Sequence, residues 1–222
     1  MIAENLRRVR EKIAAAARSA GRDPAQVRLI CVTKGIPVDP IREAVAAGAQ
    51  EIGENRVQEA QRKHGELKPS PRWHLIGRLQ RNKAKIAAAL FDVIHSVDSA
   101  ELIQALDRYA VRPLELLIQV NLSGEASKGG CRPEQAAGLA EAIRKAEHLR
   151  WSGLMTMAPY GKNPEDARPV FRGLRELRDR LEKESGLKLG LSMGMSGDFE
   201  TAVREGATMV RIGTAIFGEK TE

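Results

Sequence analysis

Short apolar stretches alternate with longer amphipathic stretches along the whole chain. The apolar stretches have the length and composition of buried strands, and the amphipathic ones have the spacing of helices. The predicted strands cover residues 28–33, 51–53, 73–76, 92–95, 114–120, 150–154, 189–192 and 208–212. The predicted helices cover residues 2–20, 39–47, 56–67, 82–90, 99–109, 133–147, a segment ending near 185, 199–205 and 215–217.

This alternation amounts to eight βα units joined by short loops. Such a pattern predicts an α/β fold, a single-domain (β/α)₈ TIM barrel over residues 1–222 with an extra N-terminal helix. The alternative is a doubly wound open sheet, but the G-x-G-x-x-G fingerprint after its first strand is missing. No linker rich in Pro, Gly or Ser divides the chain, so we expect one domain.

Composition places the chain among ordinary globular proteins, with 42% hydrophobic and 29% charged residues. No stretch approaches the roughly 20 apolar residues of a membrane span, and the charged first helix is not a signal peptide. We therefore expect a cytoplasmic location and no membrane partner. Cys31 and Cys131 lack metal-ligand spacing, so we expect core residues and no metal site.

A net charge of +7 raises nucleic acid as a partner. Against this, Lys and Arg are dispersed among 29 acidic residues, and aromatic residues, which stack on bases, make up only 4% of the chain. The densest basic run, residues 78–85, is expected to be the solvated start of a helix rather than an RNA or DNA contact. No nucleic-acid partner is expected.

Polar residues gather where the predicted strands end. In a barrel the C-terminal ends of the strands form the rim that carries chemistry. The residues at these ends are Lys34, Glu54, Asn55, His74, Gly77, His95, Ser96, Asn121, Met155, Thr156, Ser196, Arg211 and Gly213. Two segments, 193–198 and 210–214, combine glycine with hydroxyl groups after a strand, which is typical of a phosphate cradle.

Lys34 is predicted to face this cradle, because barrel closure places the first strand beside the eighth. A lysine buried next to an arginine tends toward the neutral amine, which can attack a carbonyl and form a Schiff base. A lysine beside a phosphate site fits either a phosphorylated aldehyde cofactor, pyridoxal 5′-phosphate (PLP), or a phosphosugar in an aldolase. An ordinary surface lysine after a strand is the remaining alternative.

Several motifs, in order along nearly the whole chain, resemble the YggS/PROSC family of PLP homeostasis proteins. They are residues 31–34, 53–59, 74–83, 95–98, 119–121, 153–157 and the two C-terminal segments. The resemblance implies an alanine-racemase-like barrel (PLP fold type III) with PLP as its cofactor, held as a Schiff base on Lys34. It also makes the aldolase interpretation less favoured.

The resemblance also implies roles for individual residues. Ser196 resembles the hydroxyl that contacts the phosphate, and Gly213 and Thr214 resemble the donors beside it. Arg211 resembles the arginine facing the pyridine nitrogen; a donor there keeps the nitrogen unprotonated and the ring a weaker electron sink. Asn55 is predicted to contact the cofactor hydroxyl or orient the ring, with a helix cap as the alternative.

The two histidines at strand ends, His74 and His95, are more often hydrogen-bonded structural imidazoles than pocket residues. Met155 and Met157 are expected in the pocket wall and core. None of these four residues is predicted to be catalytic.

An alanine racemase of this type has a second, β-rich domain whose tyrosine, from a partner subunit, serves as one base. The sequence leaves no room for that domain after the eighth unit, and neither Tyr109 nor Tyr160 has a matching position. We therefore expect no catalytic residues and a role in intracellular PLP homeostasis, with PLP-dependent apo-enzymes as candidate partners and a monomer or weak dimer. The alternative is a racemase-like PLP enzyme acting on a small amino acid.

Overall fold

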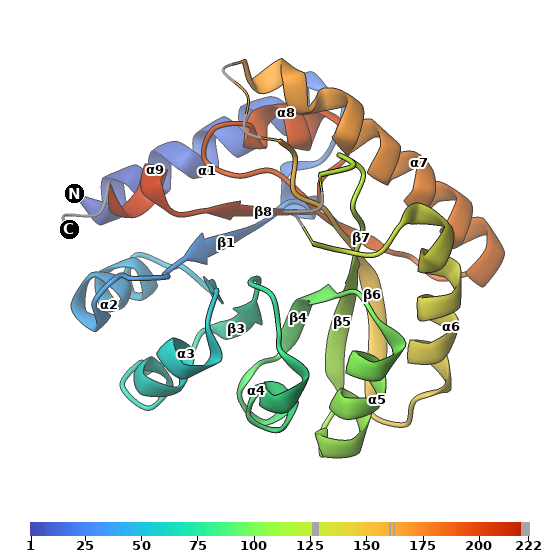
Figure 1. Cartoon of the computed structure of the whole chain (residues 1–222). Helices are drawn as coiled ribbons and strands as arrows, with labels where there is room; N and C mark the ends of the chain where they lie inside the picture. The colour runs from blue at the N-terminus through green and yellow to red at the C-terminus, as the bar shows by residue number, and fades with distance from the viewer. Residues whose placement is uncertain (126–128, 160, 162, 219–222) are drawn as a thin grey trace.

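Eight parallel strands close into a barrel in the computed structural model, which describes residues 1–125, 129–159, 161 and 163–218. The strands follow one another around the barrel, and β8 pairs with β1 to close it (Figure 1). They are β1 (Arg28–Val32), β2 (Glu51–Glu54), β3 (Arg72–Leu75), β4 (Val93–Val97), β5 (Leu114–Gln119), β6 (Leu149–Met155), β7 (Gly190–Ser192) and β8 (Met209–Ile212). The predicted (β/α)₈ fold is confirmed.

Helices surround the barrel and follow the predicted ranges closely. They are α1 (Ile2–Ser19), α2 (Val38–Ala46), α3 (Val57–His64), α4 (Ala84–Leu90), α5 (Ala100–Tyr109), α6 (Ala136–Lys145), α7 (Arg168–Ser185), α8 (Phe199–Arg204) and α9 (Thr214–Phe217). Residues 81–83 and 133–135 form 3₁₀ turns that lead into α4 and α6, whereas residues 82–83 and 133–135 were predicted as α-helix. The basic run 78–85 is the solvent-facing approach to α4, as predicted, with Arg78, Arg81 and Lys85 exposed.

The extra N-terminal helix, α1, lies across α8, α9 and α2, outside the closure between β8 and β1 (Figure 1). Its apolar residues recur every three or four positions, so that one face is buried. Leu6, Val9, Ile13 and Ala17 form that face. The helix therefore covers the outer surface where the first and last βα units meet.

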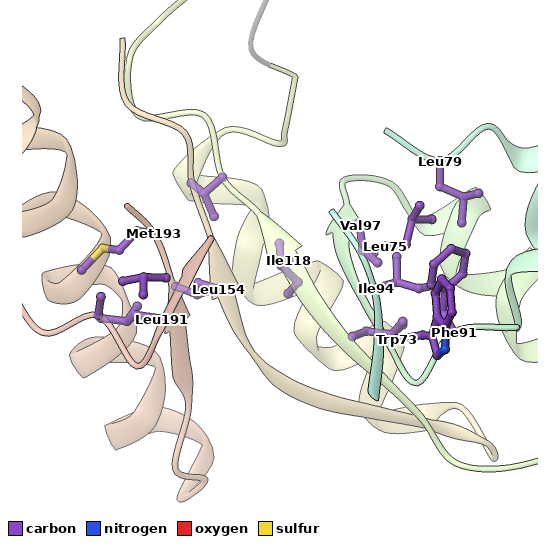
Figure 2. Packing of buried hydrophobic residues seen from close by; sticks show 14 of the residues in the cluster. Trp73, Leu75, Leu79, Phe91, Ile94, Val97, Ile118, Leu154, Leu191 and Met193 are labelled. Carbon is purple, nitrogen blue, oxygen red and sulfur yellow. The ribbon is translucent and has the colours of Figure 1, made fainter. Parts of the chain in front are cut away.

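Apolar side chains form two layers, because successive residues of a strand point to opposite faces. The outer layer fills the space between strands and helices; Trp73, Phe91 and Ile94 belong to it (Figure 2). The inner layer is a smaller cluster contributed by five strands: Ile30, Val93, Leu117, Met155 and Met209. This inner layer closes the barrel interior below the rim, so the space left for a ligand lies at the strand ends.

Both cysteines are buried and free, which confirms their prediction as core residues. Burial raises the pKa of the Cys31 thiol to about 12 and that of Cys131 to about 11. Within the described ranges, no helix combines the length and the apolar character needed to cross a membrane.

Candidate functional site

A cavity of about 640 Å³ opens at the C-terminal ends of the strands. This volume lies within the usual range of small-molecule sites. All six residues predicted to bind the cofactor line it: Lys34, Asn55, Ser196, Arg211, Gly213 and Thr214. They come from the ends of β1, β2, β7 and β8, so the fold brings together residues that are up to 180 positions apart, from Lys34 to Thr214.

Lys34 occupies a tight turn after β1. The Ile36 N–H donates to the Thr33 carbonyl oxygen at 3.0 Å, and Gly35 has a φ of +67°, which glycine adopts readily. Thr33 is fully buried, whereas Lys34 is exposed at the cavity. The prediction of a buried lysine is therefore wrong: the turn projects the residue past the last buried position of the strand.

The loop after β7 is folded tightly against α8. Gly194 has a φ of +93°, and its carbonyl accepts from Arg211 N–H at 3.0 Å. The Asp198 carboxylate accepts from the Met195 N–H at 2.6 Å, and burial raises the pKa of this carboxyl. These contacts fix a compact turn that presents Ser196 and Gly197 to the cavity.

The start of α9 forms the second half of the cradle. A Cβ on Gly213 would lie 3.2 Å from the Val32 carbonyl oxygen, so a glycine permits the close approach of β1 and β8. The first N–H groups of a helix have no partner inside it. In the described ranges, the side chains of Ser196 and Thr214 likewise make no hydrogen bond to another residue. These donors, on two adjacent loops, suit a phosphate group.

Arg211 lies on the cavity floor, with only 4% of the residue exposed. Its guanidinium donates to Ser192 Oγ at 2.7 Å and to the Thr156 carbonyl oxygen at 3.0 Å. Burial lowers the pKa of Arg211 to about 10, so the side chain remains a cation and a hydrogen-bond donor at neutral pH.

A chain of hydrogen bonds continues from Arg211 down the barrel interior. Ser192 Oγ lies 2.8 Å from His95 Nδ1, and His95 Nε2 lies 2.9 Å from His74 Nδ1. The hydrogen bonds end at His74, whose Nε2 faces Glu51 Oε2 across 3.5 Å without a hydrogen bond between them. We call these five residues the polar column. Because Arg211 can only donate, Ser192 Oγ accepts at the upper end of the column, and the His95 ring joins its two neighbours through both of its nitrogens.

Both histidines are fully buried, and neither is among the residues that line the cavity. Burial, followed by the nearby arginines, lowers the pKa of His74 well below its usual value. Burial and then His74 and Arg211 do the same for His95. The prediction of structural, hydrogen-bonded imidazoles is confirmed.

Comparison with known proteins agrees with this geometry. The family model of the alanine racemase N-terminal domain matches residues 3–221. The pyridoxal phosphate homeostasis protein of Aquifex aeolicus is 46% identical over 222 residues, covering 98% of this chain and 97% of that protein. The protein of the same name from Pseudomonas aeruginosa is 46% identical over 223 residues, with 99% and 96% covered. The chain belongs to the pyridoxal phosphate homeostasis protein family.

Solved structures related to this homeostasis family share the barrel. PipY of Synechococcus elongatus, with PLP bound, has a TM-score of 0.87 and 40% identity, covering 98% of this chain and all of that one. The Clostridium difficile alanine racemase has a TM-score of 0.73 at 14% identity, a likeness in fold alone. The match covers 99% of this chain and 58% of the racemase chain.

The remaining predictions concern residues at the rim of this homeostasis-family barrel. Asn55 lines the cavity and is not the cap of α3, whose N-cap is Arg56. Met157 lines the cavity, and Met155 belongs to the inner core, as expected. Tyr160 lies outside the described residues. The described part of the chain contains no group of three or more His, Cys, Asp or Glu side chains able to hold a metal ion.

Sequence reasoning missed some residues of the site. Asp98 and Gln119 line the cavity, and Ser192 links Arg211 to His95. A signal was available for Gln119 and Ser192, because each is a polar residue directly after apolar residues at the end of its strand. Asp98 directly follows β4, the position where rim residues are expected.

The polar column predicts that acid destabilises this protein. Two buried histidines stay neutral in the folded state, whereas the unfolded chain protonates them near pH 6.5. The unfolded state therefore binds more protons below that pH, and the free energy of unfolding falls as pH falls. We expect a loss of about 2–3 kcal/mol between pH 7.5 and 5.5, measured by urea unfolding.

His95→Gln is expected to remove about half of this pH dependence, and His148→Gln, at a half-buried histidine outside the column, should leave it intact. Burial raises the pKa values of Glu51, Glu54 and Asp198, so these carboxyls contribute with the opposite sign, and the range stops at pH 5.5 to limit their share. If the free energy of unfolding falls equally steeply with pH in the wild type and in His95→Gln, the buried histidines are not the source of the pH dependence.

Proposed function

We propose that this chain binds PLP reversibly in the rim cavity, as a Schiff base on Lys34, and acts in PLP homeostasis. One observation carries the proposal: an exposed lysine shares a cavity with hydroxyl and amide donors on two loops and with a buried arginine on its floor. An amine can bond to the aldehyde, an anion cradle suits the phosphate, and a guanidinium can donate to the pyridine nitrogen of PLP. The names of the family's characterised members support the same ligand.

Each residue has a role in this proposal. The Lys34 amine attacks the aldehyde carbon, a C=N bond forms and water leaves. Ser196, Gly213 and Thr214 donate to the phosphate, and Asn55 contacts the ring or its hydroxyl. Arg211 donates to the ring nitrogen from the floor.

We further propose that the protein works without turnover. PLP supplies an electron sink when bound. The Arg211 guanidinium can donate a hydrogen bond to the ring nitrogen but cannot accept one from a protonated ring, so the nitrogen stays unprotonated and the sink stays weak. Ser192, from the polar column, and the Thr156 carbonyl hold the guanidinium in place. A carrier role, with delivery to PLP-dependent apo-enzymes, fits this environment better than catalysis.

The test is reconstitution of the purified protein with PLP, followed by an absorbance spectrum before and after borohydride reduction and by peptide mapping. A visible band that borohydride removes, with the label on Lys34, is the expected result. Absence of any such band would refute the proposal. Incubation of the loaded protein with an amino-acid panel in D₂O separates carrier from enzyme: rapid loss of the Cα proton would favour the enzyme.

Ser196→Ala is expected to weaken PLP binding without abolishing it. The variant loses one hydroxyl donor to a charged phosphate, worth about 1–3 kcal/mol, while the donors of Gly213 and Thr214 remain. Titration of the absorbance band should give a dissociation constant raised roughly 5- to 150-fold. Ser99→Ala, at the cap position of α5 and not among the cavity-lining residues, is the matched control. Unchanged affinity in Ser196→Ala would remove this residue from the phosphate site.

A further inference from the structure

A buried ionic cluster lies directly behind the turn that carries Lys34. Lys63, on α3, is 7% exposed, and its Nζ lies 2.7 Å from Glu54 Oε1 and 2.7 Å from Glu59 Oε1. Glu54, at the end of β2, is fully buried. None of these three residues lines the cavity, so the proposed ligand contacts do not account for them.

The cluster holds the main chain on the N-terminal side of Lys34. Lys63 Nζ donates to the Thr33 carbonyl oxygen at 2.8 Å, the same oxygen that accepts from the Ile36 N–H. Thr33 Oγ1 donates to Glu54 Oε1 at 2.7 Å. The carbonyl and the hydroxyl of Thr33 are therefore both held by the cluster, while its N–H donates to the Gly53 carbonyl oxygen.

The cluster also holds the C-terminal side of Lys34. The Gly35 N–H donates to Glu59 Oε1 at 2.5 Å, so the carboxylate that pairs with Lys63 also anchors the turn. Glu59 and Lys63 are four residues apart on α3 and project together from one face of the helix. Charge-assisted contacts thus fix the residues immediately before and after Lys34.

Stability alone does not explain this arrangement, because removing the three charged groups from water costs free energy. An ion pair withdrawn from water recovers little net free energy, and an apolar replacement of similar volume is often as stable. What the ions provide here is directionality: each oxygen or ammonium accepts or donates at a defined point of the turn. The contacts are concentrated on the two neighbours of a single exposed amine.

We propose that Glu59 and Lys63 are positioning residues that set the orientation of the Lys34 turn and so present its amine to the PLP aldehyde. The inference rests on the proposed function for its ligand. Glu59 acts directly through the Gly35 N–H; Lys63 acts through the Thr33 carbonyl and by neutralising Glu54 and Glu59.

The test compares Glu59→Ala with Glu59→Gln, because glutamine keeps an oxygen that can accept from Gly35 and Lys63. Two quantities are measured: the PLP dissociation constant, from titration of the absorbance band, and hydrogen exchange of the Gly35 amide by NMR without PLP. For Glu59→Ala we expect about tenfold weaker PLP binding and at least tenfold faster Gly35 exchange. Glu59→Gln should restore both to within about twofold of the wild type.

Arg62→Ala, on the exposed side of the same helix, is the control and should leave both quantities unchanged. Lys63→Met, which keeps the apolar stem, is expected to weaken PLP binding at least as much as Glu59→Ala and to lower the melting temperature, since Glu54 loses its cation. Should that variant fail to fold, the Glu59 pair still decides the matter.

Wild-type affinity and wild-type Gly35 exchange in Glu59→Ala would overturn the inference. So would equal losses in Glu59→Ala and Glu59→Gln, because only the alanine removes the acceptor. If the wild-type protein itself forms no band with PLP, the proposed function fails, whereas Gly35 exchange in the protein without PLP still reports whether Glu59 fixes the turn.

Discussion

Lys34→Ala is expected to reduce the PLP-dependent absorbance band to background. The band requires a C=N bond to an amine, and the substitution removes the lysine amine presented to the cavity at the end of β1. Non-covalent binding through Ser196, Gly213 and Thr214 should persist at reduced affinity, since the phosphate donors are untouched. The measurement is an absorbance titration paired with borohydride reduction and mass mapping of the labelled peptide.

Lys85→Ala provides the control, because Lys85 is an exposed lysine on α4 that does not line the cavity. It should retain the full band and the label on Lys34. A band of wild-type intensity in Lys34→Ala, or a borohydride label on another lysine in the wild type, would show that Lys34 is not the attachment point. Neither result would by itself disprove that the cavity binds PLP.

Gly194→Ala is expected to have a large effect on stability. A Cβ at this position would lie 2.6 Å from the Ala202 Cβ and 3.0 Å from the Phe199 Cα, so α8 must move. Its φ of +93° adds backbone strain for any residue with a side chain. Together these effects should lower the free energy of unfolding by about 2–5 kcal/mol. For a chain of this size the melting temperature should fall by roughly 5–15 °C.

Gly197→Ala is the matched comparison within the same loop. Its Cβ would meet no atom within 4 Å, so its melting temperature should stay within about 2 °C of the wild type. Calorimetric melting of both variants without PLP separates the loop's packing from its ligand contacts. Similar melting temperatures for the two variants would mean that the loop relaxes around Gly194 without loss.

Much of the barrel could be predicted because each strand has a local signature. Residues 114–119 form an uninterrupted strand with buried apolar residues, and even β7, only three residues long, is marked by Leu191 between turn signals. The places of the six predicted site residues were accessible for a related reason: each lies at or after the end of a strand, and a closed barrel places all such positions on one rim. Their individual roles came from the family resemblance.

Side-chain contacts that form only when the barrel closes could not be predicted from the sequence in this way. Ser192 and Arg211 lie on neighbouring strands, but their link to His74 and His95 depends on four side chains converging inside the barrel. The spacing of Glu59 and Lys63 indicates a helix pair, yet nothing local shows that the pair contacts the Lys34 turn. The exposure of Lys34 likewise follows from a turn geometry that strand patterning does not encode.

The polar column also limits how this sequence can change over evolutionary time. An apolar residue in place of His95 alone would leave His74 buried without its hydrogen-bond partner and Ser192 with Arg211 alone, and a buried polar group left unpaired costs about 1–3 kcal/mol. Apolar residues introduced together at positions 74, 95 and 192 would remove the two histidines and the serine with their mutual hydrogen bonds, and Arg211 would keep the Thr156 carbonyl as an acceptor. These positions therefore drift as a set, and relatives lacking one of the polar residues should have exchanged its neighbours as well.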